Sequence, residues 1–299
     1  MNYKFTLVLN AGRSGSTFLY KLLKENFNDD CYIAHEDIPV QISEPKIYNR
    51  QYESHEIAAL KDNVKLMAYI KHWQKELKHR HVIETGWTSY HLAPLLKAIF
   101  KEQFQIIILH RDPISFAFSR ANMGNYHKNT FYTHHHEVSP YDVNSIVPSY
   151  KSKWGSMNHY EKCMYWWCVV YKEAFEFKSK SPEVPCLVLK SKELFNFSKS
   201  DEVLTFLNLN PDKLLKREVS KNELAKFMRE TFPVNEEWRN YHLHGEILDF
   251  ANNLGYEFNE QDVAQLSKKY KLPKGMMPIV RYNIQYWKLK SKLRSFFKI

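Results

Sequence analysis

Cysteine is scarce in this sequence, and no pair of cysteines has the spacing of a redox motif. The 299 residues include four cysteines, at positions 31, 163, 168 and 186, and none of them forms a Cys-x-x-Cys pair. The simplest interpretation is that all four are free thiols in a reducing compartment.

The sequence also lacks any feature that would divide it into separate parts. It contains no internal repeat, no low-complexity tract and no linker rich in glycine and serine. A length of 299 residues suits one large α/β domain or two smaller ones. We predict one domain over residues 1–257, followed by a basic helical extension over residues 258–299.

A targeting segment is missing in front of the first apolar run. The chain starts Met-Asn-Tyr-Lys-Phe and enters that run directly, which leaves no space for a signal peptide or a membrane span. We therefore expect a soluble protein of the cytoplasm.

Basic residues outnumber acidic ones. The 43 Lys and Arg residues against 33 Asp and Glu residues give a formal net charge of +10. This excess favours an anionic partner, such as a nucleotide with several phosphates, a nucleic acid or a membrane surface. Charge alone does not choose among these partners.

The most informative segment lies near the amino terminus. The apolar run Thr6 to Leu9 is typical of a buried parallel strand, and residues from Ser16 to Lys24 have apolar side chains at helical spacing. Between them, Gly12 to Gly15 form a short turn-forming loop. A strand that turns through glycines into a helix directs free backbone N–H groups and the positive helix end at one point, which is a site for an anion, most often a phosphate.

This loop lacks the lysine of a Walker P-loop. Asn10 stands at the first glycine position of Gly-x-x-x-x-Gly-Lys-Ser/Thr, and Ser16 stands at the lysine position. The absence disfavours ATP or GTP cleavage. Hydroxyl groups of Ser14, Ser16 and Thr17 and the planar cation of Arg13 supply donors for phosphate oxygens instead. The alternative is a plain strand–turn–helix connection whose glycines serve packing only.

A second segment has the same organisation. The apolar run Gln105 to Leu109 leads into His-Arg-Asp-Pro, and Pro113 then occupies a first helical position after a capping Asp112. Arg111 therefore follows the carboxyl end of a strand, where open α/β sheets bind ligands, and Ser119 lies about two helical turns later. The two corners could hold two phosphates of one nucleotide. The alternative for Arg111 is a local ion pair at the start of the helix.

The wider pattern predicts an α/β fold. Apolar runs alternate with helical patterns, which is typical of a parallel sheet covered by helices on both faces. The expected strands span residues 5–10, 31–34, 81–85, 105–110 and 185–190, and the expected longer helices span 16–26, 55–78, 90–100, 113–121 and 157–179.

Together, the two corners resemble the sulfotransferases that use 3′-phosphoadenosine 5′-phosphosulfate (PAPS). Arg13-Ser14-Gly15-Ser16-Thr17 is similar to the family's loop for the 5′-phosphosulfate, and Arg111 with Ser119 is similar to its pair for the 3′-phosphate. The resemblance covers roughly residues 4–257. Leu254-Gly255-Tyr256 is similar to the Leu-Gly-Tyr sequence at the end of the domain in carbohydrate sulfotransferases. It implies a P-loop-NTPase-like sulfotransferase architecture, with PAPS as donor and no metal.

The resemblance also suggests catalytic residues. Sulfuryl transfer needs a base for the acceptor hydroxyl and cations for the leaving oxygens. Arg13 is the candidate cation; relatives often have Lys there, so a role in electrostatic stabilisation is expected rather than proton donation. Glu36 matches the position of the glutamate base in carbohydrate sulfotransferases, and His35 is its rival because other branches use histidine. The alternative is a solvated acidic turn.

Other residues allow more than one interpretation. Glu84, at the end of strand 81–85, either orients substrate or pairs with a cation. The histidines 134–136 lack the i, i+4 spacing of a helical metal site, so we interpret them as a polar loop that lines the acceptor site or has no role. Trp166 and Trp167 lie in an apolar helical run, and we expect core residues rather than a sugar platform.

The tail from Arg281 predicts a basic amphipathic helix. Its apolar residues recur at helical spacing, at positions 282, 286, 289, 293 and 296, with lysines and an arginine largely elsewhere. Such a helix either lies on an anionic membrane surface, which would make the protein peripheral at the inner membrane, or docks on its own domain.

The hypothesis from the sequence is a PAPS-dependent sulfotransferase that acts on a hydroxyl of a carbohydrate or glycolipid. No metal and no nucleic-acid partner are expected. Two rivals remain open. A P-loop kinase would turn over ATP with magnesium, and a non-catalytic nucleotide- or nucleic-acid-binding module would bind anions with a steep salt dependence.

Overall fold

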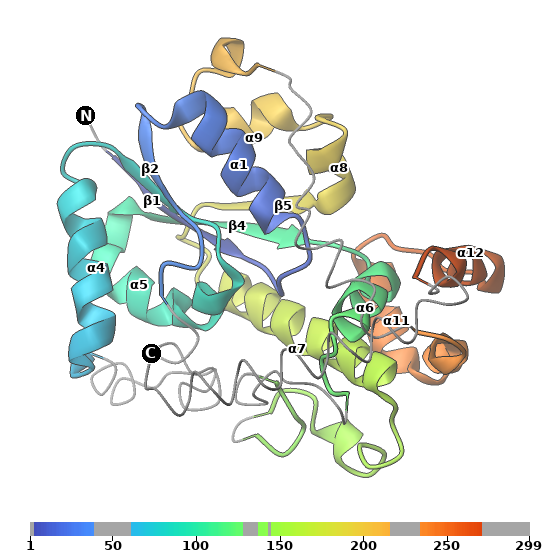
Figure 1. Cartoon of the computed structure of the whole chain (residues 1–299). Coiled ribbons are helices and arrows are strands. Elements are labelled where there is room, and N and C mark those ends of the chain that lie inside the picture. Colours follow the sequence, from blue (N-terminus) through green and yellow to red (C-terminus); the bar gives the residue numbers. More distant parts are fainter. Residues whose placement is uncertain (1–2, 39–60, 128–136, 143–144, 216–233, 271–299) are drawn as a thin grey trace, which may run out of the picture. The chain divides into compact units, whose positions relative to one another are not determined.

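The structure is a computed structural model that describes residues 3–38, 61–127, 137–142, 145–215 and 234–270 (Figure 1). The described residues form two compact units. The first takes its residues from 1–111, 138–148 and 169–220, and the second from 112–137, 149–168 and 221–299. The predicted boundary at residue 257 stays a prediction.

The first unit is built on a five-stranded, all-parallel sheet with strand order β2-β3-β1-β4-β5. The strands are β1 (Phe5–Leu9), β2 (Cys31–Ala34), β3 (His81–Glu84), β4 (Phe104–His110) and β5 (Cys186–Lys190). In the two outer pairs of the sheet the last residues of the strands pair in register, Ala34 with Glu84 and His110 with Lys190. All five connections after the strands therefore leave the sheet at the same edge.

Helices cover both faces of this sheet, which confirms the predicted α/β class (Figure 1). One face carries α1 (Ser16–Phe27), α8 (Ser191–Phe195) and α9 (Ser200–Phe206). The other carries α4 (Val64–Glu76), α5 (Ala93–Phe100) and, within the first unit, the carboxyl half of α7 (His159–Lys180).

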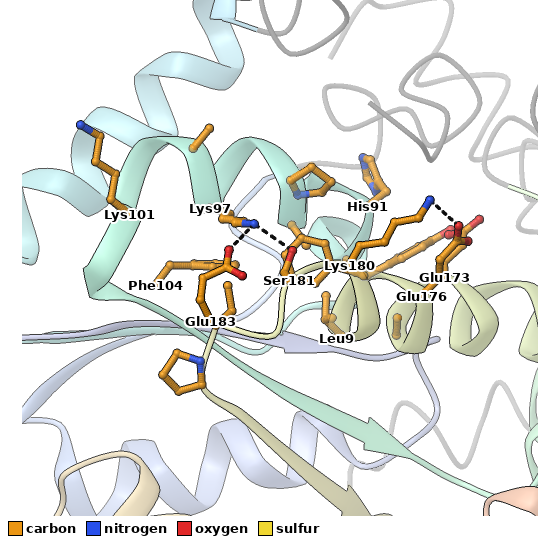
Figure 2. A pocket seen from close by; sticks show the side chains of 18 of the residues that line it. Leu9, His91, Lys97, Lys101, Phe104, Glu173, Glu176, Lys180, Ser181 and Glu183 are labelled. Atoms are coloured by element: carbon orange, nitrogen blue, oxygen red, sulfur yellow. Dashed lines mark hydrogen bonds and ion pairs between the residues drawn. The ribbon is translucent and has the colours of Figure 1, made fainter. Parts of the chain in front are cut away.

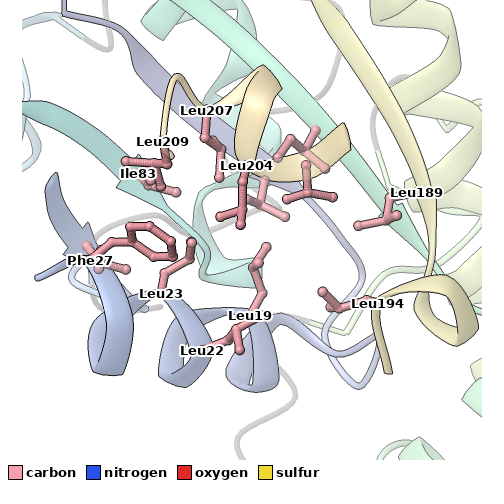
Figure 3. Packing of buried hydrophobic residues seen from close by; sticks show 14 of the residues in the cluster. Leu19, Leu22, Leu23, Phe27, Ile83, Leu189, Leu194, Leu204, Leu207 and Leu209 are labelled. Carbon is pink, nitrogen blue, oxygen red and sulfur yellow. The ribbon is translucent and has the colours of Figure 1, made fainter. Parts of the chain in front are cut away.

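The side chains of β1 alternate between two hydrophobic layers, as expected for a strand buried on both faces. Val8 belongs to the layer under α1 and α9, where Leu19, Leu23 and Leu204 are buried (Figure 3). Phe5 faces the opposite layer, where its ring centroid lies 5.2 Å from that of Trp73 and 4.2 Å from that of Phe100. Burial of each such side chain contributes about 1.5–3 kcal/mol to the stability of the fold. The two layers therefore hold the strands, and the edge at which they end, in place.

Two predicted helices are only partly reproduced. Of the helix predicted over residues 55–78, residues 55–60 lie outside the described residues, and the described part contains a helical residue at 61 followed by α4. Helix α4 starts at Val64 because the side chain of Asn63 accepts a hydrogen bond from Leu66 N and caps it. The helix predicted over 90–100 starts at Ala93, with Pro94 in its first turn. A 3₁₀ helix, η1 (Trp87–Leu92), precedes it.

The described part of the second unit is built from helices. Its helices are α6 (Pro113–Asn122), the amino half of α7, α11 (Gly245–Asn253) and α12 (Glu260–Tyr270), and its 3₁₀ helices are η4 (Pro148–Lys151) and η6 (Glu237–Leu243). The remaining 3₁₀ helices, η2 (Lys101–Gln103) and η5 (Pro211–Lys213), belong to the first unit. Trp166 and Trp167 are fully buried, which confirms them as core residues.

The Leu-Gly-Tyr segment closes α11. Gly255 has a φ of 74°, its N–H donates to Asn252 O, and the N–H of Tyr256 donates to Ala251 O. These two bonds form a Schellman motif, which needs a left-handed residue and therefore favours glycine. Helix capping thus accounts for the glycine in this part of the family resemblance.

The predicted extension over residues 258–299 is described only as far as α12, and the tail from Arg281 lies outside the described residues. Among the helices that the structure does describe, none combines the length and the hydrophobicity that a membrane span requires.

Candidate functional site

The glycine-rich loop after β1 has the backbone of an anion cradle. Three residues have left-handed conformations, Gly12 with a φ of 70°, Arg13 with 53° and Gly15 with 98°. Helix α1 begins directly afterwards, at Ser16, with Gly15 as its N-cap and no side-chain cap bond. Left-handed residues and a helix start without a side-chain cap are typical of backbone anion sites, and the binding of an anion here stays a prediction.

Asn10 holds the start of this loop. Its side-chain carbonyl accepts from Gly12 N at 2.9 Å, and its amide donates to Val8 O at 2.9 Å and to Thr85 O at 3.1 Å. The side chain is fully buried. Asn10 thus ties the loop to its own strand and to the end of β3, a role that its place in the Walker glycine position did not reveal.

Ser14 and Tyr171 hold the other side of the loop. The hydroxyl of Ser14 is fully buried, 3.0 Å from Gly12 O and 2.7 Å from the hydroxyl of Tyr171, which donates to Leu109 O. In addition, the hydroxyl of Ser191, just after β5, donates to Ser14 O and to His110 O. The Ser14 side chain is engaged within the protein, and its role as a ligand of the nucleotide stays a prediction.

The structure brings Arg111 to the loop. The guanidinium of Arg111 donates through Nη1 to Arg13 O at 3.3 Å, so the two corners that the sequence singled out meet at one edge of the sheet. Asp112 caps α6 as predicted, accepting from Ser115 N at 2.7 Å. Ser119 lies in α6 of the second unit, where it is buried, and its pairing with Arg111 at a 3′-phosphate stays a prediction.

His35 lies at the same edge, directly after β2. Its Nε2 is 3.2 Å from Thr17 Oγ1 in the first turn of α1, and its Nδ1 is 2.9 Å from Thr85 Oγ1 after β3. The ring also stacks on that of Tyr20, with centroids 5.0 Å apart. Burial lowers the pKa of His35 below its ordinary value, so the imidazole is neutral near pH 7.

Glu36 differs from His35 in its surroundings. Its side chain is 43% exposed, and its Oε1 lies 3.9 Å from His35 Nε2. The backbone of Glu36 has a φ of 60°, an uncommon conformation for a residue with a side chain. Its N–H donates to Glu84 Oε1 at 3.2 Å, which holds this turn in place.

Glu84 is a buried carboxyl group at the centre of the site. Its Oε1 accepts from Gly86 N at 2.5 Å as well as from Glu36 N, whereas Oε2 has no hydrogen-bond partner among the described residues. Burial, with a contribution from Asp37, raises the pKa of Glu84 to about 8. Within the described part of the chain Glu84 pairs with no cation. Its hydrogen bonds position the turn around Glu36, and a role in orienting substrate stays a prediction.

A cavity of about 890 Å³ lies between α5 and α7, on the face of the sheet opposite α1 (Figure 2). Lys97 and Lys180 extend along it. The first donates to Ser181 Oγ and pairs with Glu183, and the second pairs with Glu176. The predicted site residues are not among its described lining residues, so the cavity takes no part in the site built here.

The sequence did not single out Asn10, Thr85, Tyr171 or Ser191 as parts of the site. Thr85 and Ser191 each follow a strand, a position that points to the carboxyl edge of the sheet. Tyr171 lies in the middle of α7 and carries no local signal. The histidines at 134–136 lie outside the described residues, and no cluster able to hold a metal occurs among the residues that are described.

Comparison with solved structures finds several matches, among them two sulfotransferase domains. The "Sulfotransferase Domain from the Curacin Biosynthetic Pathway" is 15% identical with a TM-score of 0.47, and the match covers 86% of this chain and 99% of that chain. The "Sulfotransferase Domain from the Synechococcus PCC 7002 Olefin Synthase" is 12% identical with a TM-score of 0.36, and the match covers 90% of this chain and 96% of that chain. No family model and no curated protein matches the sequence. At these identities and TM-scores, neither structure assigns an activity or a substrate to this chain.

Proposed function

We propose that this protein is a sulfotransferase that moves a sulfuryl group from PAPS to a hydroxyl group. The observation that carries the proposal is the contact between a candidate base, His35, and the anion loop after β1. A neutral histidine, His35, lies 3.2 Å from Thr17, a hydroxyl residue of the lysine-free anion cradle. An anion cradle beside a base suits the transfer of an anionic group to a hydroxyl.

The proposed donor site uses the residues of the two corners. The backbone from Arg13 to Thr17 would hold the 5′-phosphosulfate, and Arg111 with Ser119 would hold the 3′-phosphate. The contact of Arg111 with Arg13 O supports this division, because it puts a second cation next to the loop. The net charge of +10 supports an anionic nucleotide as well.

The transfer itself needs little from the protein beyond position and charge. The acceptor oxygen attacks sulfur and loses its proton to the base, a new oxygen–sulfur bond forms, and the bond from sulfur to the 5′-phosphate oxygen breaks. The leaving 3′,5′-bisphosphate gains the negative charge. Arg13 would stabilise this charge without giving up a proton, since a guanidinium stays protonated.

His35 is the better-supported base of the two candidates. It is half-buried, with 17% of its side chain exposed and its Nε2 3.2 Å from Thr17 Oγ1, whereas the side chain of Glu36 is 43% exposed. With Glu36 Oε1 at 3.9 Å, the carboxylate can stabilise the imidazolium that forms when His35 takes the proton. We therefore assign the base to His35 and a supporting role to Glu36.

The acceptor is proposed as a carbohydrate or glycolipid hydroxyl. This part depends mainly on the position of Glu36 in the family resemblance, because the cap of α11 accounts for the glycine of the Leu-Gly-Tyr segment. The proposed surroundings are cytoplasmic, with the tail from Arg281 as a hypothetical contact to an anionic membrane surface.

The test is an assay of 3′,5′-bisphosphoadenosine released from PAPS in the presence of pooled sugar and glycolipid acceptors. We expect turnover by the unchanged protein and a loss of about a hundredfold or more in His35→Asn, the usual contribution of a positioned base. Glu36→Gln should lose less. Both variants should bind the bisphosphate normally, because neither residue belongs to the predicted nucleotide corners.

Two outcomes would contradict the proposal. Turnover of ATP with magnesium in place of PAPS would indicate a kinase. Full activity in both His35→Asn and Glu36→Gln would show that the base is not a residue of this turn.

A further inference from the structure

We infer that Thr85 is a positioning residue that fixes the tautomer of His35, so that Nε2 is the nitrogen able to accept a proton. The inference rests on the proposed function, because it assigns a part in the same reaction. Thr85 follows the last residue of β3 and is fully buried. Among the described residues, the hydrogen bonds of its hydroxyl are those with Ala34 and His35.

The hydroxyl of Thr85 has one proton, and it donates that proton in a hydrogen bond to the carbonyl of Ala34. Thr85 Oγ1 donates to Ala34 O at 3.0 Å, beside the bond from Thr85 N to the same carbonyl, also at 3.0 Å. Toward His35 Nδ1, at 2.9 Å, the hydroxyl oxygen must then act as an acceptor. The proton of the neutral imidazole therefore lies on Nδ1.

A proton on Nδ1 leaves Nε2 with a free electron pair. Nε2 is the atom that faces the loop, 3.2 Å from Thr17 Oγ1, whose hydroxyl can donate to it. In the proposed reaction, an acceptor hydroxyl that approaches sulfur above the loop would meet this electron pair. The opposite tautomer would present an N–H there and could not accept the proton.

The surroundings of His35 support a neutral ring that can be charged during the reaction. Glu36, at 3.9 Å from Nε2, and Asp37 are the anionic groups near it, and the ring of Tyr20 covers one face. Burial outweighs these carboxylates and lowers the pKa of His35. Thr85 Oγ1 can accept from Nδ1 in both the neutral and the charged ring, so it holds the orientation throughout the transfer.

The activity test compares two substitutions at one position. Thr85→Val keeps the shape of the side chain and removes the hydroxyl, whereas Thr85→Ser keeps the hydroxyl. We expect Thr85→Val to lower kcat by about ten- to a hundredfold, within the range for a general base, with unchanged affinity for 3′,5′-bisphosphoadenosine. Thr85→Ser should keep kcat within about threefold of the unchanged protein.

A double-mutant comparison separates positioning from a general structural effect. In a His35→Asn background there is no imidazole to orient, so Thr85→Val should cause no further loss. If Thr85→Val lowers the residual activity of His35→Asn by the same factor as in the unchanged protein, Thr85 does not act through His35 and the inference is wrong.

A measurement that needs no activity keeps this inference separate from the proposed function. In ¹⁵N-histidine-labelled protein, the His35 signals are those that disappear in His35→Asn. We expect Nδ1 to carry the proton and Nε2 to be unprotonated in the unchanged protein, and both nitrogens to show averaged, mixed tautomers in Thr85→Val. A proton on Nε2 in the unchanged protein would overturn the inference, whether or not the protein transfers sulfuryl groups.

Discussion

Glu84 shows how a single buried side chain shapes this site. It is fully buried, and its Oε1 binds the N–H groups of Glu36 and Gly86, while burial raises its pKa to about 8. A charged carboxylate at this place would lose its hydration without a cation in compensation. Glu84 is therefore protonated in the folded protein at pH 7, and ionised in the unfolded chain.

This difference predicts a pH dependence of stability. A group with a raised pKa in the folded state stabilises the fold at low pH and loses that contribution as pH rises toward the folded value. Between the ordinary value of 4.5 and about 8, Glu84 should lower the free energy of unfolding by up to about 1.4 kcal/mol per pH unit. Glu84→Gln keeps an oxygen for the two N–H groups and has no charge, so it should remove this slope.

Urea unfolding of both proteins at pH 5, 6, 7 and 8 measures the effect. The difference in unfolding free energy between Glu84→Gln and the unchanged protein isolates Glu84, since all other groups titrate in both. The difference should grow in favour of Glu84→Gln as pH rises. A difference that stays constant over this range would mean that Glu84 is ionised in the folded protein.

At the scale of elements, the turns after β2 and β3 are locked together by Gly86. A Cβ added at Gly86 would lie 2.3 Å from Glu36 N, 2.5 Å from Glu84 Oε1 and 2.7 Å from Glu36 Cα. Two of these atoms belong to the backbone, so the clash cannot be relieved by a side-chain rotation. The close approach requires glycine here for reasons of space.

Gly86→Ala should therefore displace the turn that carries His35 and Glu36. We expect it to destabilise the protein by about 1–3 kcal/mol, the usual cost of overpacking, and to lower turnover as well. Urea unfolding gives the first quantity and the bisphosphate-release assay the second. Gly155→Ala is the matched control, because nothing lies within 4 Å of the added Cβ, and it should change stability by less than about 0.5 kcal/mol. A Gly86→Ala protein as stable and active as this control would show that the two turns are not locked.

The same elements show which parts of the site were predictable. Strand ends and the anion loop follow from apolar runs and glycines, which are local signals, and the sequence therefore placed Arg13, His35 and Arg111 near one edge. The supports were not predictable. Tyr171 reaches the loop from a helix 157 residues away from Ser14 in sequence, and Thr85 meets His35 across 50 residues. Such contacts depend on how strands pair, which no local pattern specifies.

The expectation of a carbohydrate acceptor depended in part on a motif that can arise for structural as well as functional reasons. The Leu-Gly-Tyr segment suggested a carbohydrate enzyme, and the structure shows that Gly255 caps a helix. A Schellman cap favours glycine in any family, so the glycine of this motif could not distinguish architecture from function.

For the molecule as a whole, the central claim is that one edge of the parallel sheet is a site for a nucleotide with a 3′-phosphate. Asn10, His35, Thr85, Arg111 and Ser191 each follow one of the five strands at this edge. The chain carries a net charge of +10, which should speed the approach of an anionic nucleotide at low salt.

Thermal unfolding with matched nucleotides tests this claim most directly. A ligand that binds only the folded protein stabilises it, by about 2.7 kcal/mol at a hundred times its Kd. At equal concentrations, 3′,5′-bisphosphoadenosine should raise the unfolding temperature more than AMP or ATP does, because only the bisphosphate has a 3′-phosphate for Arg111. In Arg111→Ala, the bisphosphate should give no more than the shift of AMP. Equal shifts with bisphosphate and AMP in the unchanged protein would contradict the account.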